Sequence, residues 1–306
     1  MMTERHDSMR TELHHVAGIF TTRLVQHLHN GRRLVFFSRR VRKALPPVQL
    51  ASDGSAIAAT PAASPWLQLW APHRLAWWIA VLFIGGSACF AVASFASNWP
   101  QQVPAWLGGS RAINTVFFVG SLFFTSAAWL QLLEAINGDV ADIGVSAAKD
   151  QRAWRWFSWK PRNAGYSASL VQFVGTLLFN FNTGDAMIAG LAWSAEDLLV
   201  WAPDVIGSIC FLVASYLALV EVSHRFWSWQ PRQLSWWIVM LNLLGSMALM
   251  VAAVVGFVVP SSGNAEWLWG ANLFTLIGAV CFLLASYLLI PELFGADSQP
   301  GAVASS

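Results

Sequence analysis

The chain alternates between long apolar stretches and short polar connections. Six apolar windows hold few charged side chains: residues 75–97, 112–133, 166–188, 203–221, 234–259 and 271–290. A helix needs about 20 apolar residues to cross the roughly 30 Å hydrocarbon core of a bilayer. The pattern therefore predicts an all-α integral membrane protein with six transmembrane helices.

The six windows are arranged as three tandem copies of a two-helix unit. In each copy the proline of a Trp-x-Pro motif precedes a first glycine by fourteen residues. A second glycine precedes a phenylalanine by four, another aromatic residue by nine and a glutamate by fourteen. Repetition at a fixed spacing indicates repeated structural units. We therefore expect three helical hairpins of the same design.

This repeat divides the chain into segments. We expect a basic cytoplasmic tail at residues 1–44, an Ala/Ser/Pro-rich linker at 45–69, hairpins at 70–135, 159–222 and 229–292, a cytoplasmic connection at 136–158, and a disordered tail at 293–306.

Composition and charge support a membrane location and give an orientation. Apolar residues make up 56% of the 306 residues and charged residues 11%, which is too apolar a balance for a soluble protein. All Lys and Arg residues except Arg111 lie in the N-terminal tail or in the segments that join one hairpin to the next. Because basic residues are retained on the cytoplasmic side, both termini are expected in the cytoplasm, with the protein in a bacterial plasma (inner) membrane.

The N-terminal tail allows two interpretations. Its spaced apolar residues suggest a basic amphipathic helix that lies on anionic lipid headgroups. The alternative is a partly disordered positive segment that only fixes topology. Five of the seven histidines lie here, from His6 to His29, but their spacing gives no metal-ligand geometry, and no metal or other cofactor is predicted.

Every predicted helix has a small-residue pair near its middle. Lipid tails are as apolar as leucine, so membrane helices associate through close packing that small residues permit. Helix packing is the expected role of these glycines, and a shared midplane site or a narrow pore is the alternative. They are Gly86, Gly120, Gly175, Gly207, Gly245 and Gly278.

A glutamate ends the second helix of each hairpin. A carboxylate at a helix C-terminus opposes the helix dipole and needs a partner. The arginine that begins the first helix of the same hairpin is close enough, which predicts the pairs Arg74 with Glu134, Arg162 with Glu221, and Arg232 with Glu292. The alternative is a ring of three carboxylates at a cytoplasmic mouth, of the kind that selects cations.

The middle hairpin has extra polar residues. Asn180, Asn182 and Asp185 follow the apolar run of its first helix and form a candidate polar site, because ionisable groups at membrane depth often mark function. Asp204 follows Pro203, and this pair is typical of an ordinary helix start with a favourable dipole contact.

The hairpin motifs resemble the YrhK-like family of small bacterial membrane proteins, whose units pair two helices with central Gly-Ser and Phe positions. The resemblance depends on Phe118-Val-Gly120-Ser121-Leu-Phe-Phe124, Phe173-Val-Gly175-Thr176-Leu-Leu-Phe179 and Ile206-Gly207-Ser208-Ile-Cys-Phe211. It implies no established activity and no functional residues. The third hairpin departs from the motif, with Gly278-Ala279 and Leu249 in place of Gly-Ser and Phe.

No nucleophile with a plausible base, metal-ligand pair or phosphate loop is present, so the sequence does not predict an enzyme. It favours a non-catalytic membrane protein that scaffolds, senses, or binds partners or lipid. The alternative is an ion or small-solute conduit, in which three hairpins surround an axis along the membrane normal. An intramembrane enzyme of unfamiliar type is the third class. The expected partners are the bilayer, anionic headgroups and a protein or second copy of the chain, but not nucleic acid.

Overall fold

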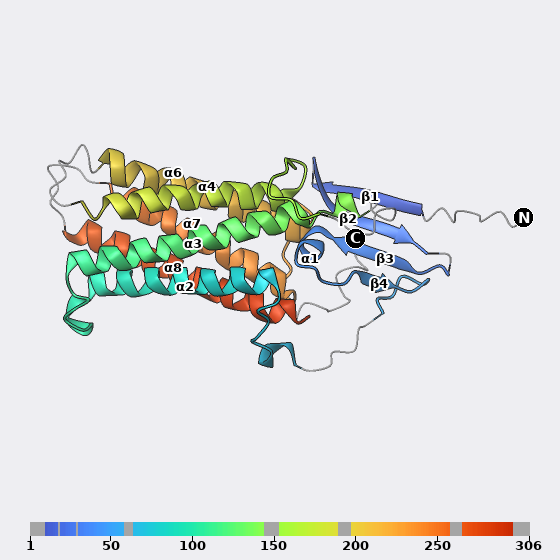
Figure 1. The fold of residues 1–306 in the computed structure, drawn as a ribbon, viewed down its shortest axis with the longest axis horizontal. Helices are drawn as coiled ribbons and strands as arrows, with labels where there is room; N and C mark the ends of the chain where they lie inside the picture. Colours follow the sequence, from blue (N-terminus) through green and yellow to red (C-terminus); the bar gives the residue numbers. More distant parts are fainter. Residues whose placement is uncertain are drawn as a thin grey trace, which may run out of the picture.

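The structure is a computed structural model that describes residues 10–17, 19–28, 30–57, 64–143, 153–188, 197–257 and 265–295. It consists of a long helical bundle with a small β-sheet at one end (Figure 1). His6, His29 and residues 296–306 of the predicted C-terminal tail lie outside the described residues.

Six long helices build the bundle: α2 (Leu75–Asn98), α3 (Ser110–Asn137), α4 (Ala164–Asp185), α6 (Ala202–Ser223), α7 (Leu234–Val255) and α8 (Ala265–Leu293). Each helix packs against the next one in the chain, and α8 packs against α2. The helices therefore form a closed ring. One face of each helix is turned toward the axis of that ring.

The apolar helices confirm a multi-pass membrane protein. In the described part of the chain, five segments are long and apolar enough to cross a membrane as helices: Leu75–Asn98, Ser110–Asn137, Leu198–Ser223, Leu234–Val255 and Trp267–Leu293. Helix α4 is not among them, because polar residues such as Gln172, Asn180 and Asn182 interrupt its apolar sequence.

An antiparallel sheet precedes the bundle. Its strands are β1 (Arg10–Ala17), β2 (Phe20–His27), β3 (Arg33–Phe37) and β4 (Val48–Leu50), in the spatial order of the chain. Leu24, Val25, Val35 and Leu50 are buried on the sheet. Between β3 and β4 the chain forms the short helix α1 (Ser38–Arg42), which lies where the sheet meets the bundle (Figure 1).

The sheet corrects two predictions for the N-terminal region. The amphipathic helix and the partly disordered segment considered for residues 1–44 are both wrong for the strand residues. The membrane bundle is helical, as predicted, but a β-sheet precedes it. Asn30-Gly31 turns the chain between β2 and β3, with Gly31 at a φ of +76° that a glycine adopts without strain. Register shifts near His15 interrupt the β1–β2 pairing, which hides the strand alternation in the sequence.

Two connections also differ from a plain linker. The predicted linker at 45–69 contains β4 and the 3-10 turn η1 (Pro65–Leu67). After α3, Gly138 is the C-cap, and a 3-10 turn η3 (Val140–Asp142) follows. A further 3-10 turn, η2 (Pro100–Gln102), joins α2 and α3.

Candidate functional site

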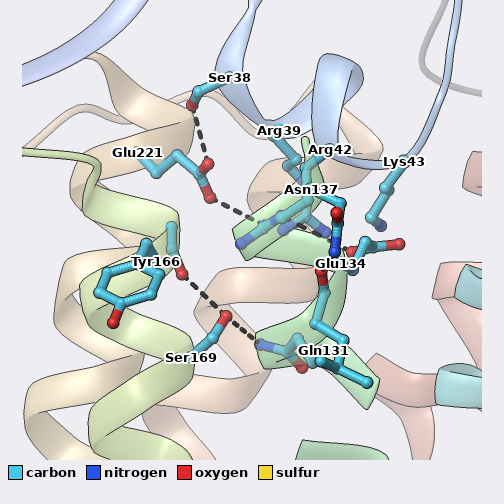
Figure 2. Close-up of polar contacts among 12 residues, drawn as sticks. Ser38, Arg39, Arg42, Lys43, Gln131, Glu134, Asn137, Tyr166, Ser169 and Glu221 are labelled. Atoms are coloured by element: carbon cyan, nitrogen blue, oxygen red, sulfur yellow. Dashed lines mark hydrogen bonds and ion pairs between the residues drawn. The ribbon is translucent and has the colours of Figure 1, made fainter. Parts of the chain in front are cut away.

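The three repeat glutamates converge at the sheet end of the bundle. Glu134, Glu221 and Glu292 are all buried, with Glu221 only 1% exposed. Helix α1 lies over them and directs its polar side chains into the mouth of the helix ring (Figure 2). The candidate site therefore begins where residues 38–43, helix α1 and the following Lys43, close this end of the bundle. We call this segment the plug.

The plug contributes three basic side chains. Arg42 lies 3.0 Å from Glu221 and 3.7 Å from Glu134. Arg39 donates to both oxygens of Glu292, at 2.7 and 3.0 Å. Lys43 also pairs with Glu292. Three positive charges thus face three carboxylates.

A hydroxyl completes this network. Ser38 Oγ donates to Glu221 Oε1 at 2.8 Å, while Arg42 Nη2 donates to the other oxygen of the same carboxylate (Figure 2). Burial, and then the charge of Arg39, lower the pKa of Lys43 to about 8, while Glu292 and Glu134 oppose the shift. The network holds charges that would be costly to bury singly.

The predicted partners of the glutamates are corrected by this arrangement. Arg162 and Arg232 are exposed. Arg74 donates to the backbone carbonyl of Leu293 at 2.7 Å instead of reaching Glu134. Each arginine begins its helix near the solvent, whereas the glutamates face the axis, so a segment that enters along the axis is better placed to pair with them.

Two glycines make room for the plug. A methyl group added at Gly138 would lie 2.4 Å from Arg42 Cα, and one added at Gly165 would lie 2.5 Å from both Arg42 Nη1 and Glu221 Oε1. Neither position belongs to the repeat. The close approach of the α1 backbone therefore explains Gly138, whereas the side chains of Arg42 and Glu221 fill the space beside Gly165.

The sheet makes a second contact with the bundle at His224. This residue follows α6 with a φ of +53°, and its ring stacks on Phe37 at a centroid distance of 5.1 Å. Burial, and then the charge of Arg23, lower the pKa of His224 to about 4, while Glu221 opposes the shift. The contact thus favours a neutral imidazole.

Below the plug lies an inner cavity of about 80 Å³. One water needs ~10–15 Å³, so the cavity is large enough for several waters. Its walls include the polar side chains of Gln131, Gln172 and Asn242. The cavity reaches from Arg39, Arg42 and Lys43 to the side chains of Phe124, Phe211 and Phe282.

Those phenylalanines belong to a ring that closes the bundle axis. Five aromatic side chains follow one another with centroid distances of 5.2–6.3 Å, in the order Phe90, Phe124, Phe282, Phe211, Phe179 and back to Phe90. Leu249 takes the sixth position, and the space inside the ring is about 10 Å³. We call this set the phenylalanine ring. It is apolar and too small to hold a column of water.

The repeat glycines position the ring. A methyl group added at Gly86 would lie 3.0 Å from the carbonyl oxygen of Gly120, and the hairpin partners Gly175 with Gly207 and Gly245 with Gly278 approach each other in the same way. Each ring residue lies one helical turn beyond a glycine. The structure therefore places the six glycines at crossings within the hairpins, and the ring residues beside them on the axis.

On the far side of the ring is an outer cavity of about 200 Å³. It touches Phe90, Phe179 and Leu249, the ring members from the first helix of each hairpin, whereas the inner cavity touches those from the second helices. Its polar lining residues are Asn114, Asn182, Thr183, Asp204 and Thr275.

The candidate polar site from the sequence is only partly brought together here. Asn182 lines the outer cavity. Asn180 does not, and its Oδ1 is buried without a hydrogen-bond partner among the described residues. Asp185 ends α4 away from the cavity lining. The carboxylate that lines the cavity is Asp204.

Asp204 lies in the first turn of α6, directly after Pro203, as the sequence predicts, but this helix start does not stand alone. A π-helical turn, η5 (Asp197–Trp201), runs directly into α6, so helical backbone precedes Asp204 by more than one turn. Pro203 cannot donate a backbone hydrogen bond within it. Asn182 Nδ2 donates to the carbonyl of Val200 at 2.8 Å, satisfying an acceptor in this irregular stretch.

Comparisons of the chain with protein-family models, curated proteins and solved structures found no match. Within the described part of the chain, no group of three or more His, Cys, Asp or Glu residues is arranged to hold a metal ion.

Proposed function

We propose that this protein is a membrane conduit for small cations, closed in the conformation described here. One observation favours this function over a scaffold. Two polar cavities end on opposite faces of a single phenylalanine ring, on the axis of a closed ring of helices. A hydrophobic constriction between two hydrated cavities is a common gate in channels.

In this proposal all six long helices cross the membrane as three hairpins, and α4 is the sixth span. Its polar residues are compatible with a membrane because Asn182 and Thr183 face the outer cavity. The sheet lies in the cytoplasm, where the excess of Lys and Arg favours it. Exposed Trp and Phe side chains near the sheet end, such as Trp156, Phe157 and Trp229, fit the headgroup layer.

Cations are the proposed cargo because carboxylates lie at both ends of the path. Glu134, Glu221 and Glu292 surround the inner mouth, and Asp204 lines the outer cavity. In the closed conformation, α1 neutralises the inner carboxylates. Withdrawal of α1 would expose a ring of three negative charges, which attracts cations and repels anions.

A sensor is the second candidate, since the sheet is tied to the bundle through ion pairs that a signal could break. Contact of the basic region with anionic lipid, binding of a protein or second copy, lack of enzymatic activity and the resemblance to the YrhK-like family stay predictions.

The conduit is tested by thallium flux into proteoliposomes that contain a thallium-sensitive dye. Leu249→Ser introduces a hydroxyl into the phenylalanine ring, and Ser38→Asp places a carboxylate beside Glu221, which repels the plug. We expect small flux in either variant and at least tenfold faster flux when both changes are combined.

Two matched controls accompany the test. Leu244→Ser makes the same change on the exposed face of α7, and Ser38→Ala removes one hydrogen bond without adding charge. Both are expected to remain as closed as the unmodified chain. Flux at the level of empty liposomes in the folded double variant would exclude the conduit and leave the sensor.

A further inference from the structure

The outer cavity has a lining suited to one chemical class of ligand. Among the lining residues that the structure describes, Asp204 is the only acidic one and none is basic. The Asp204 carboxylate has no hydrogen bond or ion pair to any described residue, although it lies beside polar side chains within a helix bundle. A carboxylate left without a protein partner in such a place is costly unless it binds a proton or a cation, so it offers a charge partner to a cationic ligand.

The neutral polar groups of the cavity present acceptors. Asn114 Nδ2 donates to the carbonyl of Ala186 at 2.7 Å, and Asn182 Nδ2 donates to that of Val200 at 2.8 Å. Since a carbonyl can only accept, these bonds fix which way both amides point. Their side-chain oxygens receive no hydrogen bond from the described residues. Thr275 Oγ1 likewise donates to the carbonyl of Ala271 at 2.9 Å and keeps its lone pairs.

The remaining wall is aromatic. Phe90, Phe117 and Phe179 line the cavity, with the rings of Phe90 and Phe117 5.2 Å apart at an interplanar angle of 79°. Ring faces attract cations, most strongly where water is excluded. A site with one carboxylate, oxygen acceptors and aromatic walls therefore suits a cation that carries both N–H donors and an apolar or planar surface.

The size of the cavity separates organic cations from metal ions. About 200 Å³ is much more than the ~10–15 Å³ that one water requires. Divalent metal ions need six or more oxygen ligands at about 2.0–2.6 Å and usually several carboxylates. One carboxylate in a roomy, partly aromatic cavity does not provide such a shell.

We propose that the outer cavity binds a small organic cation of the guanidinium type, with Asp204 as its charge partner and Asn114, Asn182 and Thr275 as acceptors. A guanidinium ion is planar, rich in N–H donors and weakly hydrated, so it can leave water for this site. That this cation is also the cargo rests on the conduit function proposed above. Binding at the site does not.

The test is equilibrium binding of radiolabelled guanidinium to the full chain in nanodiscs. We expect saturable binding, a roughly ten- to hundred-fold loss of affinity in Asp204→Asn, and a roughly three- to tenfold loss in Thr275→Val, which removes an acceptor but keeps the shape. Asp185→Asn is the matched control. It removes a carboxylate from the adjoining helix end, outside the cavity lining, and should bind as the unmodified chain does.

Competing ions define the ligand class. Tetramethylammonium has the charge but no N–H donor, and sodium has neither donors nor an apolar surface, so both should displace guanidinium only at much higher concentration. Equal displacement by sodium would overturn the organic-cation assignment. Absence of saturable binding, or unchanged affinity in folded Asp204→Asn and Thr275→Val, would overturn the site.

The two proposals can fail separately. Guanidinium binding that depends on Asp204, together with no flux in any ring variant, would retain this site and exclude the conduit. Thallium flux through the opened ring without guanidinium binding would do the reverse.

Discussion

The two ends of the bundle bury carboxylates in opposite ways. At the inner end, Glu221 receives hydrogen bonds from Ser38 and Arg42, and Glu292 is paired with two basic side chains. At the outer end, Asp204 faces a cavity with no partner among the described residues. A carboxylate whose partners belong to the same chain stabilises a conformation. One that lacks them is available to a ligand.

The largest expected effect breaks the inner network. Arg42→Met removes the cation shared by Glu221 and Glu134 and leaves buried negative charge without its partner. We expect a loss of ~3–5 kcal/mol in the free energy of unfolding. Thermal or denaturant unfolding in detergent measures it.

Arg232→Met is the control, because it removes an exposed arginine that the repeat pattern pairs with Glu292. Its expected effect is within ~0.5 kcal/mol. Equal destabilisation by the two changes would contradict the plug and restore the pairing predicted from the repeats.

Only part of this arrangement could be predicted from the sequence. The helices and the positions of glycine, phenylalanine and glutamate follow from apolar length and repeat spacing, which are local properties. The partners of Glu221 do not, since Arg42 is 179 positions away in the chain and meets it only through the tertiary structure. Asn30-Gly31 is the available signal for a β-hairpin, whereas the close contacts at Gly138 and Gly165 are visible only in the structure.

The phenylalanine ring was also only partly predictable from the sequence. The spacing of four residues from each second glycine predicts a repeated phenylalanine, but it does not say whether that side chain faces lipid or the axis. The direction in which each phenylalanine side chain points depends on how the three hairpins close into one ring. Likewise, Pro203-Asp204 predicts the first turn of α6, but it predicts neither the π turn before that helix nor the cavity that Asp204 lines.

An intermediate effect is expected from pH at the inner end. His224 has its Nδ1 buried without a hydrogen bond among the described residues, and its charged neighbours are Arg23 on β2 and Glu221 on α6. Burial lowers its pKa to about 4 in the folded chain, compared with an ordinary value of 6.5. Between these values the unfolded chain binds a proton and the folded chain does not. Stability should therefore fall as the pH drops from about 6.5 to about 4, by at most about 3 kcal/mol.

The measurement is denaturant unfolding over that pH range in the unmodified chain and in His224→Asn. Asparagine tolerates the left-handed backbone at this position, so the substitution removes the titrating group without adding strain. The carboxylates also titrate at the acidic end of the range, and the difference between the two chains isolates the histidine. Parallel pH profiles would show that His224 does not contribute.

The smallest change in stability is expected at Asp204, and it tests the difference between the two ends of the bundle most directly. Asp204→Asn keeps the shape of the side chain and removes a charge that no described residue balances. In the absence of ligand, the free energy of unfolding should therefore change by less than ~0.5 kcal/mol or increase, in contrast to the large loss expected at the inner end. Unfolding in a buffer without organic cations measures this, and repeating it with guanidinium below denaturing concentrations should stabilise the unmodified chain more than the variant. A large loss in ligand-free buffer would instead mean that Asp204 has a structural partner, and the two ends of the bundle would then use their carboxylates in the same way.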